Sequence, residues 1–493
     1  MRADRAHAQR FASYVAQGFS SACDPASYVA QGFSPAYGSA SYVAQGFSPA
    51  YGLARERQPR RVLMTADAVG GVWDYSLQLA AALGAGGTEV TLATMGPRPT
   101  EAQREQAAAI PSIRLAESDF PLEWMEAPWD GVAQAGGWLR DLADAIDPDV
   151  VHLNGYVHAA LPWRAPVVVV AHSCVCSWWM AVHGCEAPES WTRYRRAVRN
   201  GLSAADAVVA PSRAMLAALS AHYGPIEGLV IPNGRDAEAA RSGSRGDASG
   251  LHAGLKPRAT PFAPGSPSAT DSRGAGLPPC VVRGAGLPPS PEASADHRSL
   301  GGGGQPCATK EPLILAAGRL WDPAKNIGAL AAIAGRLPWR VAVAGDLEAP
   351  GHGTALPPSG ILALGRLPAG DLRAWLDRAS IYALPARYEP FGLSVLEAAL
   401  ARAALVLGDI PSLRENWDGA AWFVPPSDTG ALHAAIARLI EDDERRTELG
   451  RRAYARAREF SVARMAGGYR RLYAALLGHE GRRAARRAAP CAS

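Results

Sequence analysis

The feature that most restricts the fold of this chain is an alternation of short, continuous apolar runs with longer helical stretches. In the first half, such runs begin at Arg61, Glu89, Asp149, Pro166 and Asp206. In the second half, they begin at Leu313, Arg340, Ile381, Ala404 and Ala421. Continuous apolar runs are typical of strands that are buried on both faces of a parallel sheet. The pattern therefore predicts an α/β fold of two Rossmann-like, doubly wound domains, with ligands bound beyond the carboxyl ends of the strands in a cleft between the domains.

Two segments without this alternation divide the chain. The string ASYVAQGFS recurs at Ala12, Ala26 and Ala40, and residues 239–305 are rich in Gly, Pro and Ser. Neither segment can bury enough apolar surface to offset the entropy cost of ordering it. We predict a disordered repeat tail (1–59), an N-terminal domain (60–238), a low-complexity insertion or linker (239–305), a C-terminal domain (306–478) and a basic disordered tail (479–493). The last helix is a candidate to pack back on the N-terminal domain.

The composition argues against several classes of protein. A formal net charge of +4 over 493 residues does not indicate a nucleic-acid-binding surface. The longest apolar run, residues 165–171, is much shorter than the roughly 20 residues of a membrane-spanning helix. The 7 cysteines are odd in number and scattered, which favours a reducing, cytoplasmic setting over a disulfide framework. We expect at most peripheral contact with a membrane.

The segment that begins at Glu389 has the features of an anion-binding helix start. It reads EPFGLSVLE, in which Pro390 is suited to the first turn of a helix, and a helix start with Pro and Gly leaves backbone N–H groups without partners. These groups belong to Phe391, Gly392, Leu393 and Ser394. A diphosphate would suit them, and Glu389 and Glu397 on either side can accept hydrogen bonds from polyol hydroxyls. The structural alternative makes Glu389 a partner of the helix dipole and Glu397 a solvated helix residue.

Two turns after other strands supply matching groups. In GRLWDPAKN, Arg319 lies at a strand end and Lys325 just before a helix, so the two cations can contact a diphosphate, although surface ion pairs would also explain them. Gly70 and Gly71 follow the first strand and permit close approach of the backbone to a ligand, or merely close a turn. His172 also ends a strand, where a histidine can be either functional or a hydrogen-bonded structural residue.

Seven motifs over residues 60–478 occur in an order that resembles the retaining glycosyltransferases of family 4. They are GGVW at Gly70, HS at His172, APS at Ala210, IPNG at Ile231, GRLWDPAKN at Gly318, EPFGLSVLE at Glu389 and FVPPSD at Phe423. The resemblance implies the GT-B fold of two facing Rossmann-like domains. It implies that Arg319 and Lys325 contact the diphosphate of a sugar nucleotide, Glu389 the donor sugar and Glu397 the ribose. Gly71 and His172 would face the donor from the acceptor side.

The chain also departs from the family pattern. The spacing from Arg319 to Lys325 is one residue longer than in the commonest members, and the chain reads DIPSLRE where relatives often carry a Gly-Gly pair before a Glu. The family role of that Glu therefore transfers only weakly to Glu415.

The resemblance implies transfer of a hexose from a nucleoside diphosphate sugar to an acceptor hydroxyl, with retention. The sequence does not identify the acceptor, which we expect to be a saccharide, a lipid-linked acceptor or a small molecule. We expect no cofactor, no obligatory metal and no nucleic-acid partner. The run from His172 to Cys185 fits no structural zinc spacing, and the first turn lacks the G-x-G-x-x-G of a nicotinamide site. Two alternatives remain open, a GT-B sugar-nucleotide epimerase and a catalytically silent sugar-nucleotide-binding protein.

An aromatic and basic segment between His172 and Arg199 bears on the acceptor. It contains Trp178, Trp179, Met180, Trp191, Arg193, Tyr194, Arg195 and Arg196. Core packing beneath a solvated arginine face explains such a segment, and so does an amphipathic surface that lies near anionic lipid. The sequence leaves both interpretations open.

Overall fold

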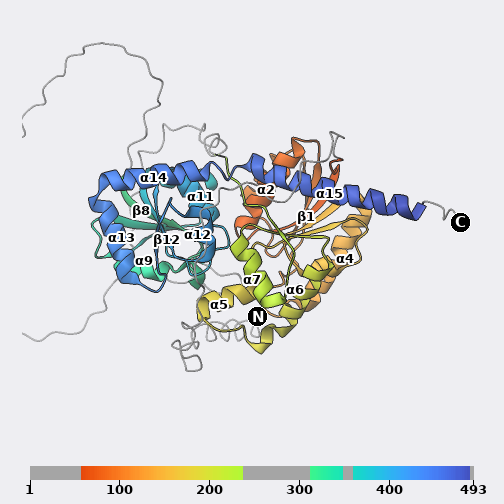
Figure 1. The fold of residues 1–493 in the computed structure, drawn as a ribbon, viewed down its shortest axis with the longest axis horizontal. Helices are drawn as coiled ribbons and strands as arrows, with labels where there is room; N and C mark the ends of the chain where they lie inside the picture. Colours follow the sequence, from red (N-terminus) through yellow and green to blue (C-terminus); the bar gives the residue numbers. More distant parts are fainter. Residues whose placement is uncertain (1–56, 237–310, 348–358, 489–493) are drawn as a thin grey trace, which may run out of the picture. The chain divides into compact units, whose positions relative to one another are not determined.

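The computed structural model describes residues 57–236, 311–347 and 359–488, and within these ranges the chain forms two parallel sheets flanked by helices (Figure 1). The predicted insertion over 239–305 and all but the last three residues of the predicted tail over 1–59 lie outside the described residues.

The N-terminal domain contains a sheet with the strand order β3-β2-β1-β4-β5-β6-β7, in which every pairing is parallel. Its strands are β1 (Arg61–Asp67), β2 (Glu89–Met95), β3 (Ile113–Glu117), β4 (Val150–Leu153), β5 (Val167–Val170), β6 (Ala207–Ala210) and β7 (Leu229–Val230). Its helices are α2 (Gly71–Gly84), α3 (Glu101–Ala108), α4 (Trp129–Ile146), α5 (Val175–His183), α6 (Thr192–Ala204) and α7 (Arg213–Tyr223), with short 3-10 turns η2 (Val157–Ala160) and η3 (Glu189–Trp191).

The C-terminal domain repeats this plan, with the parallel order β10-β9-β8-β11-β12-β13. Its strands are β8 (Glu311–Ala317), β9 (Arg340–Ala344), β10 (Leu362–Gly365), β11 (Ala379–Leu384), β12 (Ala404–Gly408) and β13 (Trp422–Val424). Its helical segments are η4 (Pro323–Lys325), α9 (Ile327–Ala334), α10 (Ala369–Arg378), α11 (Leu393–Leu400), α12 (Pro411–Trp417), α13 (Thr429–Glu441) and α14 (Asp443–Ala457), and α15 (Val462–Ala488) follows them.

The central strands form because their residues are buried on both faces. All four valines of β5 and all six residues of β11 are buried, with helices covering both sides of each sheet. Each of the ten predicted apolar runs contains a strand, so the predicted pair of doubly wound domains is confirmed. Sequence reasoning missed β3, β7 and β10, which are sheet-edge strands with few fully buried residues and therefore carry a weaker apolar signal.

Helix α15 lies against α2 of the N-terminal domain (Figure 1). Met465, Tyr469, Leu472 and Tyr473 are buried in the same core cluster as β1 and α2. The predicted end of the C-terminal domain at residue 478 falls inside this helix, which continues through Ala488 because its final residues, rich in Ala and Arg, are good helix formers. None of the helices in the described ranges combines the length and the apolar character needed to cross a bilayer.

In each sheet the chain order reverses beside the first strand of the domain, between β1 and β4 and between β8 and β11. Loops that leave the carboxyl ends of two such strands run to opposite faces of the sheet, and ligands of open α/β sheets bind in the crevice this creates. The predicted site residues follow β1, β5, β8 and β11. They therefore belong to loops and helix starts at or next to these two reversal points.

Candidate functional site

Lys325 and Glu389 form an ion pair in the C-terminal domain. Lys325 Nζ donates to Glu389 Oε2 at 2.6 Å, and only 13% and 14% of the two side chains are exposed. The second carboxylate oxygen, Glu389 Oε1, accepts the backbone N–H of Gly392 at 2.9 Å. Lys325 is placed by η4, and Glu389 by the loop after β11. The structure thus brings together a cation and a carboxylate that lie far apart in the sequence.

Arg319 is held by a different carboxylate. It donates to Asp322 Oδ2 at 2.7 Å, while the indole N–H of Trp178 donates to Asp322 Oδ1 at 3.0 Å. Burial alone would raise the pKa of Asp322, but the charges of Arg319 and Lys325 hold it below its usual value. The same two cations therefore share one buried anion.

The N-terminal domain contributes an acid to this group of charges. Asp67 ends β1, and its carboxylate accepts the N–H of Val69 at 3.0 Å. Burial raises the pKa of Asp67, and the Val69 hydrogen bond and the charge of Arg319 oppose the rise. The ends of β1 and β8 thus present opposite charges to each other.

The start of α11 differs from the prediction in two ways. The helix begins at Leu393, so Pro390 precedes it, and Gly392 adopts a left-handed conformation with φ 88°. The N–H of Gly392 is not free, because Glu389 accepts it. Among the described residues, no acceptor is found for the N–H groups of Phe391, Leu393 and Ser394. These three groups keep the anion-binding capacity that the sequence predicts for the helix start.

Gly71 and Gly70 differ in their surroundings. A Cβ on Gly71 would meet Leu393 Cδ1 at 3.0 Å, whereas a Cβ on Gly70 would meet nothing within 4 Å. Gly71 is the first residue of α2 and Leu393 the first residue of α11. The amino-terminal ends of two helices therefore approach each other here, and both dipoles favour a negative charge at this place.

Glu397 lies one turn into α11 and is paired with Arg235. Arg235 Nε donates to Glu397 Oε1 at 2.7 Å, and a second guanidinium nitrogen lies 3.4 Å from Asp74 of α2. The Arg235 side chain is only 9% exposed. Burial raises the pKa of Glu397, and Arg235 opposes this rise. Glu397 is therefore a half-buried carboxylate with an arginine partner, not the solvated helix residue of the structural alternative.

His172 is half-buried after β5, and the structure does not pair it with any of the charged residues above. Its Nε2 lies 2.9 Å from Asn154 Oδ1, and its ring meets the ring of Tyr75 edge-on at 4.5 Å. Burial lowers the pKa of His172 to about 4, so the ring is neutral near neutral pH.

Several hydrogen bonds tie the loop after β11 to the N-terminal domain. The Tyr388 hydroxyl accepts the N–H of Cys174 at 3.2 Å, and Ser212 Oγ donates to the carbonyl of Pro390 at 2.9 Å.

Glu415 of α12 also contacts the N-terminal domain. It accepts the N–H groups of Arg213 and Ala214 at 2.9 Å each, and so caps α7. Glu415 therefore has a structural use in this chain.

The cysteines of the segment that starts at His172 do not form a metal-binding group. Cys174 and Cys176 are buried free thiols, and Cys174 Sγ accepts the N–H of Ser177 at the start of α5. Within the described ranges no group of three or more His, Cys, Asp or Glu side chains is placed to hold a metal ion. Independence from a metal stays a prediction.

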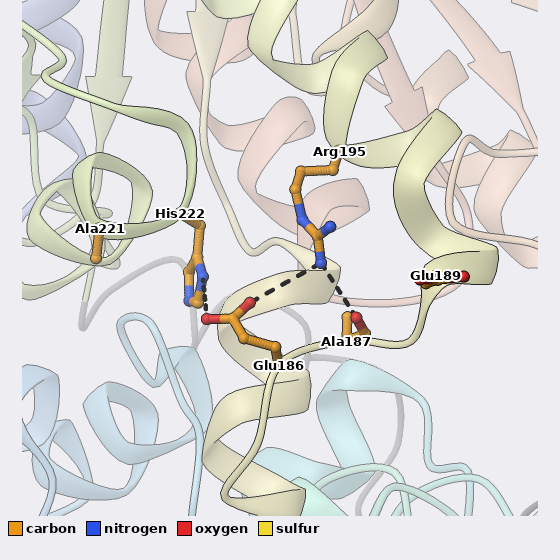
Figure 2. Close-up of a pocket in the computed structure, with 6 residues that line it drawn as sticks. All are labelled: Glu186, Ala187, Glu189, Arg195, Ala221 and His222. Atoms are coloured by element: carbon orange, nitrogen blue, oxygen red, sulfur yellow. Dashed lines mark hydrogen bonds and ion pairs between the residues drawn. The ribbon is translucent and has the colours of Figure 1, made fainter.

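A separate cavity of about 310 Å³ lies between the end of α7 and the segment around η3. Figure 2 shows Glu186 between His222 and Arg195, with Arg195 also donating to the carbonyl of Ala187. None of the predicted site residues lines this cavity. The aromatic and basic segment beside it has a buried Tyr194 and exposed Arg193 and Arg196, an arrangement that fits both interpretations of this segment.

Sequence reasoning missed four polar residues of the site, namely Asp67, Asn154, Arg235 and Asp322. Asp67 ends a predicted strand, Asn154 directly follows another, and Asp322 lies inside a motif that was singled out. A search for polar residues at every strand end would have found the first two. Arg235 follows IPNG, and only the folded chain places it beside Glu397.

The fold and the site define an α/β protein of two doubly wound domains with cations and helix starts at the strand ends. Residues 69–239 match the model of Glycosyltransferase Family 4, and residues 311–442 match that of Glycosyl transferases group 1. Together the two matches span more than half of the chain. The chain belongs to the family of glycosyltransferases that these two models describe, one for each domain, and its fold is GT-B.

Individual proteins are similar over the whole fold or over shorter stretches. Sucrose-phosphate synthase from Thermosynechococcus elongatus aligns with a TM-score of 0.61 at 17% identity, over 86% of this chain and 100% of that one. Anabaena HepE, solved with UDP-glucose, aligns with a TM-score of 0.53 at 17% identity, over 83% and 97%. The lipopolysaccharide core mannosyltransferase LpcC of Rhizobium leguminosarum bv. viciae is 36% identical over 123 residues, 24% of this chain and 34% of LpcC. The matches cover about a fifth to a third of the length of the curated relatives.

Proposed function

We propose that this protein is a retaining glycosyltransferase that moves a hexose from a nucleoside diphosphate sugar to an acceptor hydroxyl. The observation that carries the proposal is the grouping of Lys325, Glu389 and the first N–H groups of α11 beside Arg319. The similarity to Anabaena HepE, which was solved with UDP-glucose, supports a sugar nucleotide as donor. The similarity to LpcC supports a saccharide or lipid-linked saccharide as acceptor. No metal or cofactor enters the proposal.

Each group has a part in the proposed reaction. The leaving diphosphate gains negative charge as the sugar–oxygen bond breaks, and Arg319, Lys325 and the α11 amides stabilise that charge. The ion pair with Lys325 and the N–H of Gly392 hold the Glu389 carboxylate toward the donor sugar. Glu397 accepts from the ribose hydroxyls through its oxygen Oε2, since Oε1 is bonded to Arg235. The protein acts mainly by positioning and electrostatic stabilisation.

The donor is identified first. Purified protein is screened against UDP-, GDP- and ADP-sugars by thermal shift and by slow hydrolysis of the donor, with and without EDTA. We expect one nucleotide class to raise the melting temperature, and EDTA to leave that shift and the hydrolysis unchanged. Retention is tested by the anomeric configuration of the product in an NMR spectrum. An epimerised donor in the absence of acceptor would favour an epimerase, and binding without turnover in any acceptor mixture would favour a silent binding protein.

Substitutions in the cation pair then test the assignment of the site. Arg319→Ala and Lys325→Ala should each lower kcat and kcat/KM by roughly tenfold to a hundredfold, because a charge-assisted hydrogen bond contributes about 1.5 to 3 kcal/mol. Arg336→Ala is the matched control, because Arg336 is exposed in the same domain. Steady-state kinetics on folded variants measures the effect. Wild-type rates in both Arg319→Ala and Lys325→Ala would contradict the proposal.

A further inference from the structure

Asn154 is fixed in one orientation by its own hydrogen bonds. Its side-chain nitrogen Nδ2 donates to the backbone carbonyl of Thr65 at 2.6 Å and to Ser76 Oγ at 3.1 Å. Its backbone N–H donates to Thr65 Oγ1 at 2.9 Å. A carbonyl oxygen can only accept, so the amide nitrogen must face Thr65 and cannot exchange places with Oδ1. Oδ1 is consequently turned toward the two histidines that flank it.

Both neighbouring histidines lie within hydrogen-bond distance of Asn154 Oδ1 through Nε2. His172 Nε2 lies 2.9 Å from Asn154 Oδ1, and His152 Nε2 lies 3.2 Å from the same atom. An amide oxygen has no proton to offer, so His172 Nε2 carries the hydrogen. His152 Nε2 also lies 3.4 Å from the Tyr75 hydroxyl, and it donates to Asn154 Oδ1 in the tautomer that carries its hydrogen on Nε2. The other nitrogen of His152, Nδ1, lies 2.7 Å from the hydroxyl of Tyr473 on α15, which then donates to it. Burial lowers the pKa of His152 to about 3 and that of His172 to about 4, so neither ring needs a second proton.

We propose that Asn154 is a positioning residue that fixes His172 as the Nε2–H tautomer and leaves His172 Nδ1 as a hydrogen-bond acceptor for a sugar hydroxyl. No hydrogen bond to Nδ1 is found in the part of the chain that the structure describes. The edge-on contact with Tyr75 and the bond to Asn154 restrain the ring from two directions. The kinetic consequence rests on the proposed function, whereas the protonation pattern of the ring does not.

The tautomer has a chemical consequence. A neutral imidazole donates through one nitrogen and accepts through the other, and the bond made by one nitrogen decides the role of the other. With Asn154 in place, His172 Nδ1 can accept the hydrogen of a hydroxyl group and orient it. Without Asn154, the proton can move to Nδ1, and the same ring atom then presents a donor where an acceptor is needed.

The protonation pattern is tested on the full-length wild-type chain with ring-¹⁵N-labelled histidine. A long-range ¹H–¹⁵N spectrum at neutral pH distinguishes protonated from unprotonated ring nitrogens, and the signals of His172 are assigned by their loss in His172→Gln. We expect a protonated-type signal at Nε2 and an unprotonated-type signal at Nδ1. A protonated Nδ1 in the wild-type protein would overturn the proposal without any further variant.

The second arm uses Asn154→Ala with Tyr473→Phe as the matched control. Both variants act on the same buried network: Tyr473→Phe removes one hydrogen bond, to His152. Asn154→Ala removes the side-chain bonds to Thr65, Ser76 and both histidines, and it alone removes the acceptor of His172. We expect Asn154→Ala to give a mixed tautomer signal and to lower kcat about tenfold, with the Kd of nucleoside diphosphate changed less than about twofold. Tyr473→Phe should keep the tautomer of His172 and a kcat within about twofold of wild type.

The outcomes separate this proposal from the proposed function. A wild-type protein that neither binds nucleotide nor transfers sugar contradicts the proposed function, and the wild-type spectrum still decides the tautomer. A folded Asn154→Ala variant that keeps the Nε2–H signal and wild-type kcat contradicts the positioning role. An equal loss of kcat in Asn154→Ala and Tyr473→Phe would assign the effect to general support of the core, and would also count against the proposal.

Discussion

Arg235 joins two acidic residues from different domains in a largely buried place. Its guanidinium contacts Glu397 of α11 and Asp74 of α2, and its backbone N–H donates to the carbonyl of Phe460 at 2.9 Å. Removing one partner of a buried ion pair leaves the other charge without compensation, which costs more than the pair itself contributes. Arg235 therefore supports both the packing of the two helices and the ionised state of Glu397.

Arg235→Ala should lower the free energy of unfolding by about 1 to 3 kcal/mol near neutral pH, because the charged, half-buried Glu397 loses its partner. Burial already raises the pKa of Glu397, and Arg235 counteracts this rise. In Arg235→Ala the pKa of Glu397 therefore rises further. A carboxyl whose pKa is higher in the folded than in the unfolded state destabilises the fold above that pKa, and the penalty disappears as the pH falls through it. The penalty should therefore be smaller at about pH 5 than at about pH 7.5 in urea denaturation.

The controls for this prediction use the same kind of change. Arg451→Ala removes an exposed partner of Glu448 and should leave the free energy of unfolding almost unchanged, because solvent screens such a pair. Arg235→Ala combined with Glu397→Gln should recover part of the loss, because the uncompensated charge is gone. A pH-independent loss in Arg235→Ala would show that lost packing, and not the charge of Glu397, is responsible.

At the scale of elements, close helix packing depends on single glycines. α6 lies against η2, and a Cβ on Gly201 of α6 would come within 1.9 Å of the carbonyl oxygen of Tyr156. Real side-chain atoms do not approach so closely, so the helix would have to move away from the turn. The glycine therefore sets the distance between α6 and η2, the turn that follows β4 and Asn154.

Gly201→Ala should lower the free energy of unfolding by about 1 to 3 kcal/mol, the usual cost of overpacking, despite the better helix propensity of alanine. Gly137→Ala is the matched control, because Gly137 is an exposed residue of α4 with nothing within 4 Å of an added Cβ. That variant should gain about 0.5 to 1 kcal/mol. Equal effects of the two substitutions in chemical denaturation would contradict the contact between α6 and η2.

Element prediction from the sequence succeeds where burial is uniform and fails where tertiary contacts decide. The valines from 167 to 170 are apolar on both faces, so their periodicity alone predicts β5. The start of α11 is different, because Ser212 of the other domain binds the carbonyl of Pro390, and Glu389 binds the N–H of Gly392. These contacts keep Pro390 and Gly392 out of the helix, although their residue types suit a helix start.

At the scale of the whole molecule, the sequence likewise predicts some residues of the site and not others. Residues at strand ends, such as Arg319 and His172, are predictable because the carboxyl ends of parallel strands share one edge of the sheet. The hydrogen-bond partners of site residues cannot be predicted in this way. Asn154 contacts His172, and Arg235 contacts Glu397, only in the folded chain. What each charged group does therefore depends on contacts that sequence spacing does not encode.

The last helix of the chain follows the C-terminal domain and completes the core of the N-terminal domain. α15 starts beside the segment that leaves β7, where the N–H of Val462 donates to Asp236 at 3.1 Å. It then buries Tyr469, Leu472 and Tyr473 in the core of the N-terminal domain. A domain that lacks part of its core is not expected to be stable on its own. We therefore expect the domains to unfold together in one transition.

Leu472→Ala tests this coupling. Leu472 is 5% exposed, and loss of a buried leucine side chain lowers the free energy of unfolding by about 2 to 5 kcal/mol. The neighbouring Arg471 is exposed on the same helix, so Arg471→Ala should change stability by less than about 0.5 kcal/mol. Unfolding is followed by circular dichroism of the whole chain and by loss of nucleotide protection, which reports on the C-terminal domain under the proposed function. Leu472 lies in the N-terminal core, so if the two domains unfold in one transition, Leu472→Ala should shift both signals by the same amount. A shift in circular dichroism with unchanged nucleotide protection would show that the C-terminal domain folds without the N-terminal core that α15 completes.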